Sequence, residues 1–281
     1  MNVGNGDCTI VQMPDNTIMM VDVCNARTAP REANSDFTNP LQYLDNLDDL
    51  SEIFRYVQTH PDMDHMDGLS DVLNSYSITN FWDTRNTKPR PEEFGYGYRE
   101  EDWGAYERLR GSSAAKFRLR KVDSIGLNGG TFPYGIYVIS PSQPLIDEAN
   151  RTEDWNLLSY VILVRYGGFK LLLGGDASDA AWEDIHRWVL TDRNARSLIS
   201  CVAIFRVSHH GAASSYCGSD ILDILQPRKV IISKGPSQDD SAYTNYYNWF
   251  GSADNLRLSS QGTVIVDYNL QTNRFEVSQT E

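Results

Sequence analysis

Apolar residues recur along this chain in short runs separated by glycine, proline and polar turns, a pattern typical of many short strands and helices. Runs that are brief and rich in β-branched and aromatic residues favour strands, whereas longer runs with helical spacing favour helices. We predict strands at 2–13, 17–24, 53–59, 117–123, 134–140, 200–207, 229–233 and 262–268, and helices at 40–48, 69–75, 105–115, 178–190, 219–225 and 241–250.

Residues 158–175 predict a β-hairpin, because two apolar runs meet at the pair Gly167-Gly168. Segment 76–125 is the least regular part of the pattern and is interrupted by glycine and proline. Its aromatic rings favour either of two interpretations, a binding-site rim on which a base stacks or a hydrophobic cluster under a long loop. We found no low-complexity linker and predict one domain over 1–281, with an irregular aromatic insert at about 76–125.

Composition narrows the classes of protein. The formal net charge of −13 disfavours a non-specific binder of long nucleic acid, which gathers Lys and Arg against phosphates. A basic cluster at 108–121 is either a phosphate-facing strip or a solvated surface. No apolar run approaches the ~18 residues of a membrane helix, and no secretion signal is evident, so we expect no membrane partner and a cytoplasmic location.

The histidines are unevenly distributed. The chain has five, of which two lie in residues 59–68 and two form the pair His209-His210. The first stretch, Thr-His-Pro-Asp-Met-Asp-His-Met-Asp-Gly, also holds three carboxylates. Imidazole nitrogens and carboxylate oxygens are the ligands of hydrolytic divalent metals. His60, Asp62, Asp64 and His65 are therefore candidate metal ligands, and the alternative is a solvated acidic loop.

The spacing of these four residues requires a turn. In an extended segment, residues 60, 62 and 64 share one face and His65 points away. Pro61 keeps His60 extended, and Gly68 permits an unusual backbone turn. We predict that the ligands follow a strand and lead into the helix at 69–75, with Asp67 as its N-cap.

Two later strand ends carry similar chemistry. Gly174-Gly175-Asp176 follows the hairpin, and Asp176 is either a metal ligand with an unhindered backbone or a helix N-cap. Ser208-His209-His210-Gly211 follows the strand at 200–207, and two adjacent histidines there favour a site. No Gly-x-Ser-x-Gly, Walker or Rossmann motif offers an alternative.

Five sequence blocks in this order resemble the metallo-β-lactamase superfamily, and within it the hydrolase domain of ComEC-type DNA-uptake proteins and their stand-alone relatives. The blocks are Val-Gly-Asn-Gly-Asp at 3–7, Val-Asp-Val-Cys at 21–24, the His-x-Asp-x-Asp-His signature at 60–65, the strand pair from Asn156 to Asp176, and Ser-His-His-Gly at 208–211. The resemblance spans roughly residues 2–268. It implies an α/β fold, the αβ/βα sandwich of two mixed β-sheets flanked by helices.

The resemblance also implies a metal centre with two divalent ions, Zn or Mn. His60 and Asp62 are expected to bind one ion, Asp64 and His65 the other, and Asp176 both. His210 is expected to complete the second position, with His209 beside the substrate. Asp64 is expected to orient the attacking water.

The chain departs from the family's pattern in several places. Cys24 stands where the family has glycine. Asn156 stands where relatives place another histidine ligand, and the family's later Gly-His-Pro is missing. Asn156 and Lys234 are the candidate substrate-binding residues, with the Lys234 ammonium compensating for the missing histidine.

These expectations describe a metal-dependent hydrolase, a phosphodiesterase or nuclease-like enzyme using metal-activated hydroxide. The acidic charge favours a small or short phosphodiester, a nucleotide or single-stranded nucleic acid. The alternatives are a lactone or β-lactam hydrolase, and a binding module without turnover on the same fold. The sequence predicts no oligomeric state.

Overall fold

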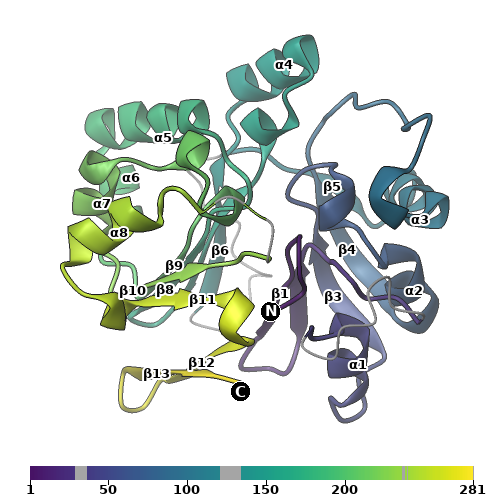
Figure 1. The fold of residues 1–281 in the computed structure, drawn as a ribbon, viewed down its shortest axis with the longest axis horizontal. Coiled ribbons are helices and arrows are strands. Elements are labelled where there is room, and N and C mark those ends of the chain that lie inside the picture. The colour runs from purple at the N-terminus through teal and green to yellow at the C-terminus, as the bar shows by residue number, and fades with distance from the viewer. Residues whose placement is uncertain (29–36, 121–133, 236–237, 239, 281) are drawn as a thin grey trace.

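Two β-sheets face each other at the centre of the molecule, and helices cover their outer faces (Figure 1). The computed structural model describes residues 1–28, 37–120, 134–235, 238 and 240–280. The first sheet has the order β1-β2-β3-β4-β5, with β1 antiparallel and the others parallel. Its strands are β1 (Thr9–Gln12), β2 (Ile18–Val21), β3 (Glu52–Val57), β4 (Ser77–Asp83) and β5 (Ala115–Phe117).

The second sheet has the order β11-β10-β9-β8-β7-β6. Strands β8 to β11 are parallel, and β6 and β7 are antiparallel to their neighbours. Its strands are β6 (Tyr134–Ser140), β7 (Val161–Tyr166), β8 (Phe169–Leu173), β9 (Ile204–Arg206), β10 (Lys229–Ile232) and β11 (Leu256–Leu258). A separate hairpin joins β12 (Val264–Asn269) to β13 (Arg274–Gln279).

The helices divide between the two outer faces. The first sheet is covered by α1 (Pro40–Asp45), α2 (Leu69–Ser75) and α3 (Glu100–Arg110), and the second by α5 (Asp179–Thr191), α6 (Arg193–Ile199), α7 (Ser219–Leu225) and α8 (Tyr243–Phe250) (Figure 1). Helix α4 (Gln143–Thr152) lies uppermost in this view. The predicted αβ/βα sandwich of two mixed sheets is confirmed.

Three hydrophobic clusters fill the three spaces between these four layers. In β2, Ile18 and Met20 belong to the cluster under α1 to α3, while Met19 and Val21 belong to the cluster between the sheets. Strand β7 alternates in the same way between the central cluster and the cluster under α5 to α8. Because successive side chains of a strand point to opposite faces, a strand buried on both faces is apolar at every position.

Most of the predicted elements are present, some with the predicted limits and others with shifted boundaries. The helices at 69–75 and 219–225 and the strand at 134–140 have the predicted limits, and the hairpin turns at Gly167-Gly168. The strand predicted at 2–13 is restricted to β1, because the chain bends at Gly4 and Gly6, both with positive φ. Asp67 does not cap α2. Its carboxylate accepts from Asn25 N–H and Arg27 Nε–H, and Gly68 stands at the N-cap with φ +96°.

Segment 76–125 is more regular than predicted, because β4 and α3 lie within it. The helix predicted at 105–115 is α3, which begins at Glu100 and ends before Gly111. The strand predicted at 117–123 is β5, which ends at Phe117, and residues 121–123 lie outside the described residues. Three of the aromatic side chains considered as stacking platforms belong to the buried core, namely Phe81, Trp82 and Trp103.

The prediction missed β4, α4, α6, β11 and β13. Helices α4 and α6 are short, with ten and seven residues, and each buries only a few apolar side chains. Strand β11 has three residues, and β13 pairs with β12 alone.

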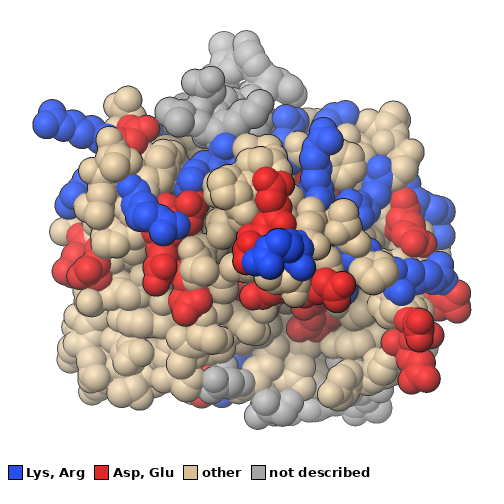
Figure 2. All heavy atoms as spheres, turned by 90° about the horizontal axis from the view of Figure 1, so that it is seen from above, with Lys and Arg blue, Asp and Glu red and all other residues tan. Residues whose placement is uncertain are grey.

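Lys and Arg alternate with Asp and Glu over the face seen from above, and no broad field of one sign is present there (Figure 2). Two members of the predicted basic strip are already paired, Arg110 with Asp83 and Arg120 with Asp184. Lys121 lies outside the described residues. Among the residues that the structure describes, none of the helices combines the length and the apolar character needed to cross a bilayer.

Candidate metal centre

The candidate ligands come from loops that follow the carboxyl ends of parallel strands in both sheets. Strand β3 leads to His60, β8 to Asp176 and β9 to His209-His210. In α/β sheets, ligands bind outside the carboxyl ends of the strands because the loops there leave a crevice. Residues distant in the sequence therefore meet at one edge of the sandwich.

Gln58 shapes the loop that carries the His-x-Asp-x-Asp-His signature. Its buried side-chain amide donates to the peptide oxygen of His60 at 2.8 Å and to that of His65 at 3.0 Å. A single amide thus holds both ends of the loop. Between them, η1 (Met63–His65) supplies the turn that returns His65 to the side of His60. The predicted turn is present.

His65 is oriented by Asp22, the residue directly after β2. The Asp22 Oδ2 atom accepts from His65 Nδ1 at 2.7 Å, and both side chains are fully buried. Thr59 donates its N–H and its hydroxyl to the same carboxylate at 2.7 and 2.6 Å. A carboxylate that accepts from one ring nitrogen fixes the tautomer, so His65 presents the lone pair of Nε2 to the site.

His60 and His210 have the same tautomer as His65. The Thr59 hydroxyl lies 3.0 Å from His60 Nδ1 and has given its only proton to Asp22, so it accepts from His60 Nδ1–H. His210 Nδ1 lies 2.8 Å from the Ser233 carbonyl oxygen, which can only accept. All three buried imidazoles therefore direct an Nε2 lone pair away from their supporting partners.

Asp176 is held by a tight turn after β8. Gly175 has φ +52°, and an added Cβ would lie 2.5 Å from the Tyr160 carbonyl oxygen. The Gly175 carbonyl accepts from Arg206 Nη1 at 2.7 Å and from the His209 N–H at 2.9 Å. The Asp176 N–H binds the Ser159 hydroxyl at 2.8 Å. This turn requires glycine before the aspartate and brings it close to the His209-His210 segment.

The His209-His210 pair lies in a strained turn. Both residues have positive φ, +49° and +57°, which side chains other than glycine adopt at a cost of order 1–3 kcal/mol each. The turn directs both rings toward Asp176. The Nε2 atom of His210 lies 3.6 Å from Asp176 Oδ2, and that of His209 lies 4.0 Å from it.

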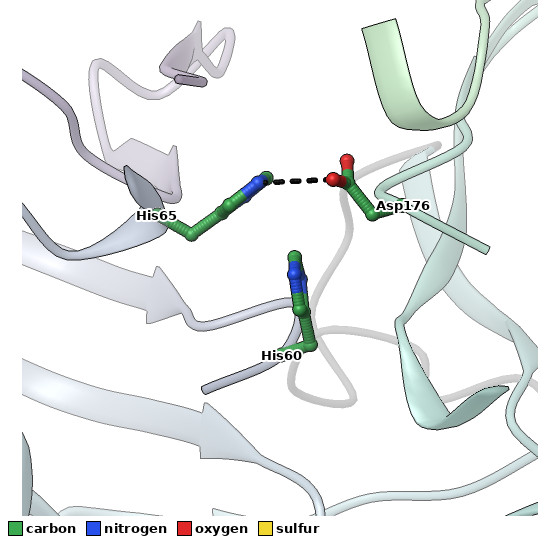
Figure 3. A group of neighbouring side chains, drawn as sticks. All are labelled: His60, His65 and Asp176. Atoms are coloured by element: carbon green, nitrogen blue, oxygen red, sulfur yellow. Dashed lines mark ion pairs between the residues drawn. The ribbon is translucent and has the colours of Figure 1, made fainter. Parts of the chain in front are cut away.

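His60, His65 and Asp176 point toward a common centre, the two histidines from the first-sheet side and the aspartate from the second (Figure 3). The His65 Nε2 atom lies 3.2 Å from Asp176 Oδ2. Three groups of potential ligands share His65, and in each of them the ligand atoms lie within 4.8 Å of one another. Two groups consist of predicted ligands, His60–His65–Asp176 and Asp64–His65–His210, and each suits one metal ion. The third is Asp7–Asp22–His65, in which Asp22 already accepts from His65 Nδ1.

The polar atoms at this centre fit a metal ion. His65 Nε2, His210 Nε2 and Asp176 Oδ1 are buried without a hydrogen-bond partner. An unpaired buried polar atom costs of order 1–3 kcal/mol, and three that face one space indicate a common ligand. A divalent cation accepts both kinds of donor, imidazole nitrogen and carboxylate oxygen.

The charges of the site favour a cation as well. Burial alone would lower the pKa of His65, but Asp176, Asp22 and Asp64 raise it well above its usual range. Burial alone would raise the pKa of Asp176, but His65 and His210 hold it well below that of an ordinary carboxyl. Burial lowers the pKa of His210, so this imidazole is neutral at pH 7. The second proton that His65 would bind, on Nε2, occupies the position that a metal ion would take.

The two remaining carboxylates of the loop lie nearer to solvent. Asp64 Oδ2 is 3.8 Å from His65 Nε2 and 4.0 Å from His210 Nε2, and its side chain is 29 % exposed. Asp62 Oδ2 is 3.5 Å from His60 Nε2, while its other oxygen forms an ion pair with Lys88. Burial opposes ionisation of Asp62, but His60 and Lys88 lower its pKa below the usual range.

The structure thus brings together the six predicted ligands, His60, Asp62, Asp64, His65, Asp176 and His210, with His209 at their edge. The two predicted substrate-binding residues have other surroundings. Lys234 Nζ pairs with Asp240 at 2.8 Å. Asn156 lies in η3 (Trp155–Leu158), where its Oδ1 atom is buried without a hydrogen-bond partner. Their roles stay predictions.

Asp22, Gln58 and Lys88 were not identified as site residues from the sequence. Asp22 lies in the Val-Asp-Val-Cys block, and a carboxylate directly after a buried strand is a signal for it. Gln58 and Lys88 have no such signal, because glutamine and lysine are common on ordinary surfaces.

No family model and no curated protein sequence matches the chain. A search of solved structures finds CmlA, a diiron β-hydroxylase from Streptomyces venezuelae, at 14% identity and a TM-score of 0.49, over 82% of this chain and 43% of that chain. A mutant of CmlA gives 12% identity and 0.49, over 81% and 44%. A protein from Parabacteroides distasonis ATCC 8503, described as a candidate metal-dependent hydrolase, gives 11% and 0.45, over 88% and 86%.

The present chain spans less than half the length of the CmlA chains. TM-scores below 0.5 do not by themselves establish a shared fold. The sandwich is therefore assigned from the sheet order and the four layers of this chain.

Proposed function

We propose that this chain is a metal-dependent hydrolase that cleaves phosphodiesters. One observation carries the proposal: three buried imidazoles donate through Nδ1 and direct Nε2 toward carboxylates contributed by both sheets. The ordered motifs that resemble the metallo-β-lactamase superfamily, and the ComEC-type hydrolase domains within it, support the same reading.

The ligands would divide between two ions. His60, His65 and Asp176 form one group, and Asp64, His65 and His210 form the other. Asp62 adds an oxygen beside His60. Divalent zinc or manganese bound here would lower the pKa of a bound water to about 7 and offset charge that develops on a phosphoryl oxygen.

Asp64 and His209 are suited to proton transfer, because both remain accessible. The Asp64 carboxylate lies beside His65 and His210 and can accept a proton from the attacking water. His209 is 33 % exposed, and its Nδ1 atom contacts the Ser215 hydroxyl at 3.1 Å. Its Nε2 atom lies near Asp176 at the edge of the ligands, where it can contact substrate or protonate a leaving group.

A small or short substrate fits the charge of the molecule. The net charge of −13 repels a long polyanion, and the face in Figure 2 offers no continuous basic surface. A nucleotide or a short single strand carries few phosphates and requires little neutralisation beyond that given by the metal ions.

The proposal is tested with bis(p-nitrophenyl) phosphate after the protein has been loaded with zinc or manganese. We expect turnover, and we expect Asp64→Ala to reduce kcat by roughly 100-fold or more, as loss of a general base does. Asp48→Ala, which removes an exposed carboxylate from the loop after α1, is the matched control. Metal analysis should find more than one ion per chain.

Other outcomes would contradict the proposal in distinct ways. Full turnover by Asp64→Ala would remove this carboxylate from the mechanism. Hydrolysis of lactone or β-lactam substrates but not of phosphodiesters would favour attack on a carbonyl carbon. Bound metal without turnover of either class would favour a binding module.

A further inference from the structure

We propose that Lys88 is the residue with which this site recognises an anionic oxygen of its substrate. The proposal rests on the proposed hydrolase function and deepens it. Lys88 Nζ forms an ion pair with Asp62 Oδ1, while Asp62 Oδ2 faces His60 Nε2 at 3.5 Å. One carboxylate therefore separates the ammonium from the imidazole ligands, at the outer edge of the metal centre.

The backbone around Lys88 is held on both sides. The Thr87 N–H and hydroxyl donate to Asn150 Oδ1 of α4 at 2.8 and 3.2 Å, and Asn150 Nδ2 donates to the Arg85 carbonyl at 2.9 Å. The Lys88 N–H donates to Asn86 Oδ1 at 3.3 Å. These hydrogen bonds fix the backbone position of Lys88. An ordinary surface lysine on a loosely held loop has no such restraint.

The ammonium is partly removed from solvent and retains donor capacity. The Lys88 side chain is 19 % exposed, and its Nζ atom lies 6.0 Å from the centre of the Trp155 ring. An ammonium has three N–H donors, and the structure gives one of them to Asp62. The others can bind an oxygen that approaches the metal centre from solvent.

Charge selects the class of substrate. A phosphodiester carries a negative charge on its non-bridging oxygens, which a metal ion and an ammonium can share. A neutral ester or lactone lacks this charge and gains little from Lys88. Lys234, the lysine considered from the sequence, pairs with Asp240, whereas the carboxylate partner of Lys88 is Asp62, one of the candidate metal ligands.

The test compares two substrates that differ in charge but share a leaving group, bis(p-nitrophenyl) phosphate and its neutral methyl triester. Lys88→Gln should lower kcat/KM for the diester by roughly 10- to 100-fold, as loss of a hydrogen bond to a charged group does. The same variant should leave the triester nearly unchanged, and Lys88→Arg should recover most of the diester activity. Lys116→Gln is the control, because the Lys116 ammonium donates to the Ser113 carbonyl.

Equal losses on both substrates, or no loss on either, would overturn the proposal. A loss of bound metal in Lys88→Gln would also overturn it, because Lys88 would then act by supporting Asp62. If the wild-type protein hydrolyses neither substrate, the proposed function fails. The role of Lys88 is then tested separately, by calorimetry of phosphate binding. Inorganic phosphate should then bind the metal-loaded wild type about tenfold more tightly than Lys88→Gln, and equal affinities would refute the assignment.

Discussion

At the scale of the residue, the identity of each hydrogen-bond partner decides which nitrogen of a histidine is available. Asp22, the Thr59 hydroxyl and the Ser233 carbonyl each accept from an Nδ1 atom. None of these three partners lies in the His-x-Asp-x-Asp-His signature. The metal centre therefore depends on these hydrogen-bond partners as well as on the ligands, because the partners set the orientation and basicity of the imidazoles.

Replacing Asp22 with asparagine tests this point. The amide retains an acceptor for the Thr59 N–H but can present an N–H group to His65 Nδ1, which disfavours the tautomer that binds metal through Nε2. We expect metal affinity to fall roughly 10- to 100-fold, measured by competition with a chelating dye. Asp45→Asn is the control, because Asp45 accepts from the Tyr76 hydroxyl outside the centre. An unchanged affinity would show that Asp22 does not orient His65.

At the scale of the element, the candidate site residues lie in the loops that follow the carboxyl ends of the strands. Strands β2, β3, β8 and β9 are mostly apolar and are buried at their carboxyl-terminal ends, and polar residues of the site lie shortly after each of them. The loop after β3 needs support of its own, since a six-residue turn that carries buried carbonyl groups has few internal hydrogen bonds. Gln58 supplies that support from the strand end.

Gln58→Leu should therefore destabilise the protein and loosen the loop. It removes the donor to the His60 and His65 carbonyl groups and leaves buried acceptors with fewer partners. We expect the free energy of unfolding to fall by about 1–3 kcal/mol, measured by urea denaturation, together with weaker metal binding. Gln42→Leu, an exposed position on α1, serves for comparison. Equal stability of the wild type and Gln58→Leu would show that the loop is held by other contacts.

At the scale of the whole molecule, the metal centre lies where the two sheets meet. His60 and His65 follow strands of the first sheet, and Asp176 and His210 follow strands of the second. The Tyr160 hydroxyl adds a direct link between the sheets, donating to the Asp83 carbonyl at 2.6 Å. An ion shared by these ligands would connect both halves of the sandwich.

Removal of metal should therefore lower the thermal stability of the whole chain. At a metal concentration of one hundred times Kd, binding stabilises a folded protein by about 2.7 kcal/mol. For a chain of this size, that corresponds to a fall in Tm of roughly 5–10 °C on chelation, measured by calorimetry. Returning zinc should restore the transition, and His210→Gln should respond less. Superimposable transitions with and without chelator would argue against a metal shared by the two sheets.

Much of this architecture could be predicted from local patterns, while the supporting residues could not. The hairpin at Gly167-Gly168 follows from its local pattern, whereas the αβ/βα sandwich and the convergence of the six ligands were implied by ordered motifs that resemble the metallo-β-lactamase superfamily. Strand β4 was missed because the glycines and prolines that follow it from Pro89 onward made the whole segment 76–125 resemble a loop, although Phe81 and Trp82 pack in the core. Lys234 was considered for substrate contact because the family's later histidine is missing, and the sequence did not predict its ion pair with Asp240.

The sequence by itself determined which chemistry is possible, since residue types and their spacing set the available ligands and the strands that carry them. Tertiary structure alone decided which ring nitrogens are free, which carboxylate supports His65 and which lysine stands at the edge of the site. The physical reason is the range of the interactions. Strand and turn preferences act over a few residues, whereas the hydrogen bond from His65 to Asp22 joins positions far apart in the chain and exists only after β2 and β3 have paired.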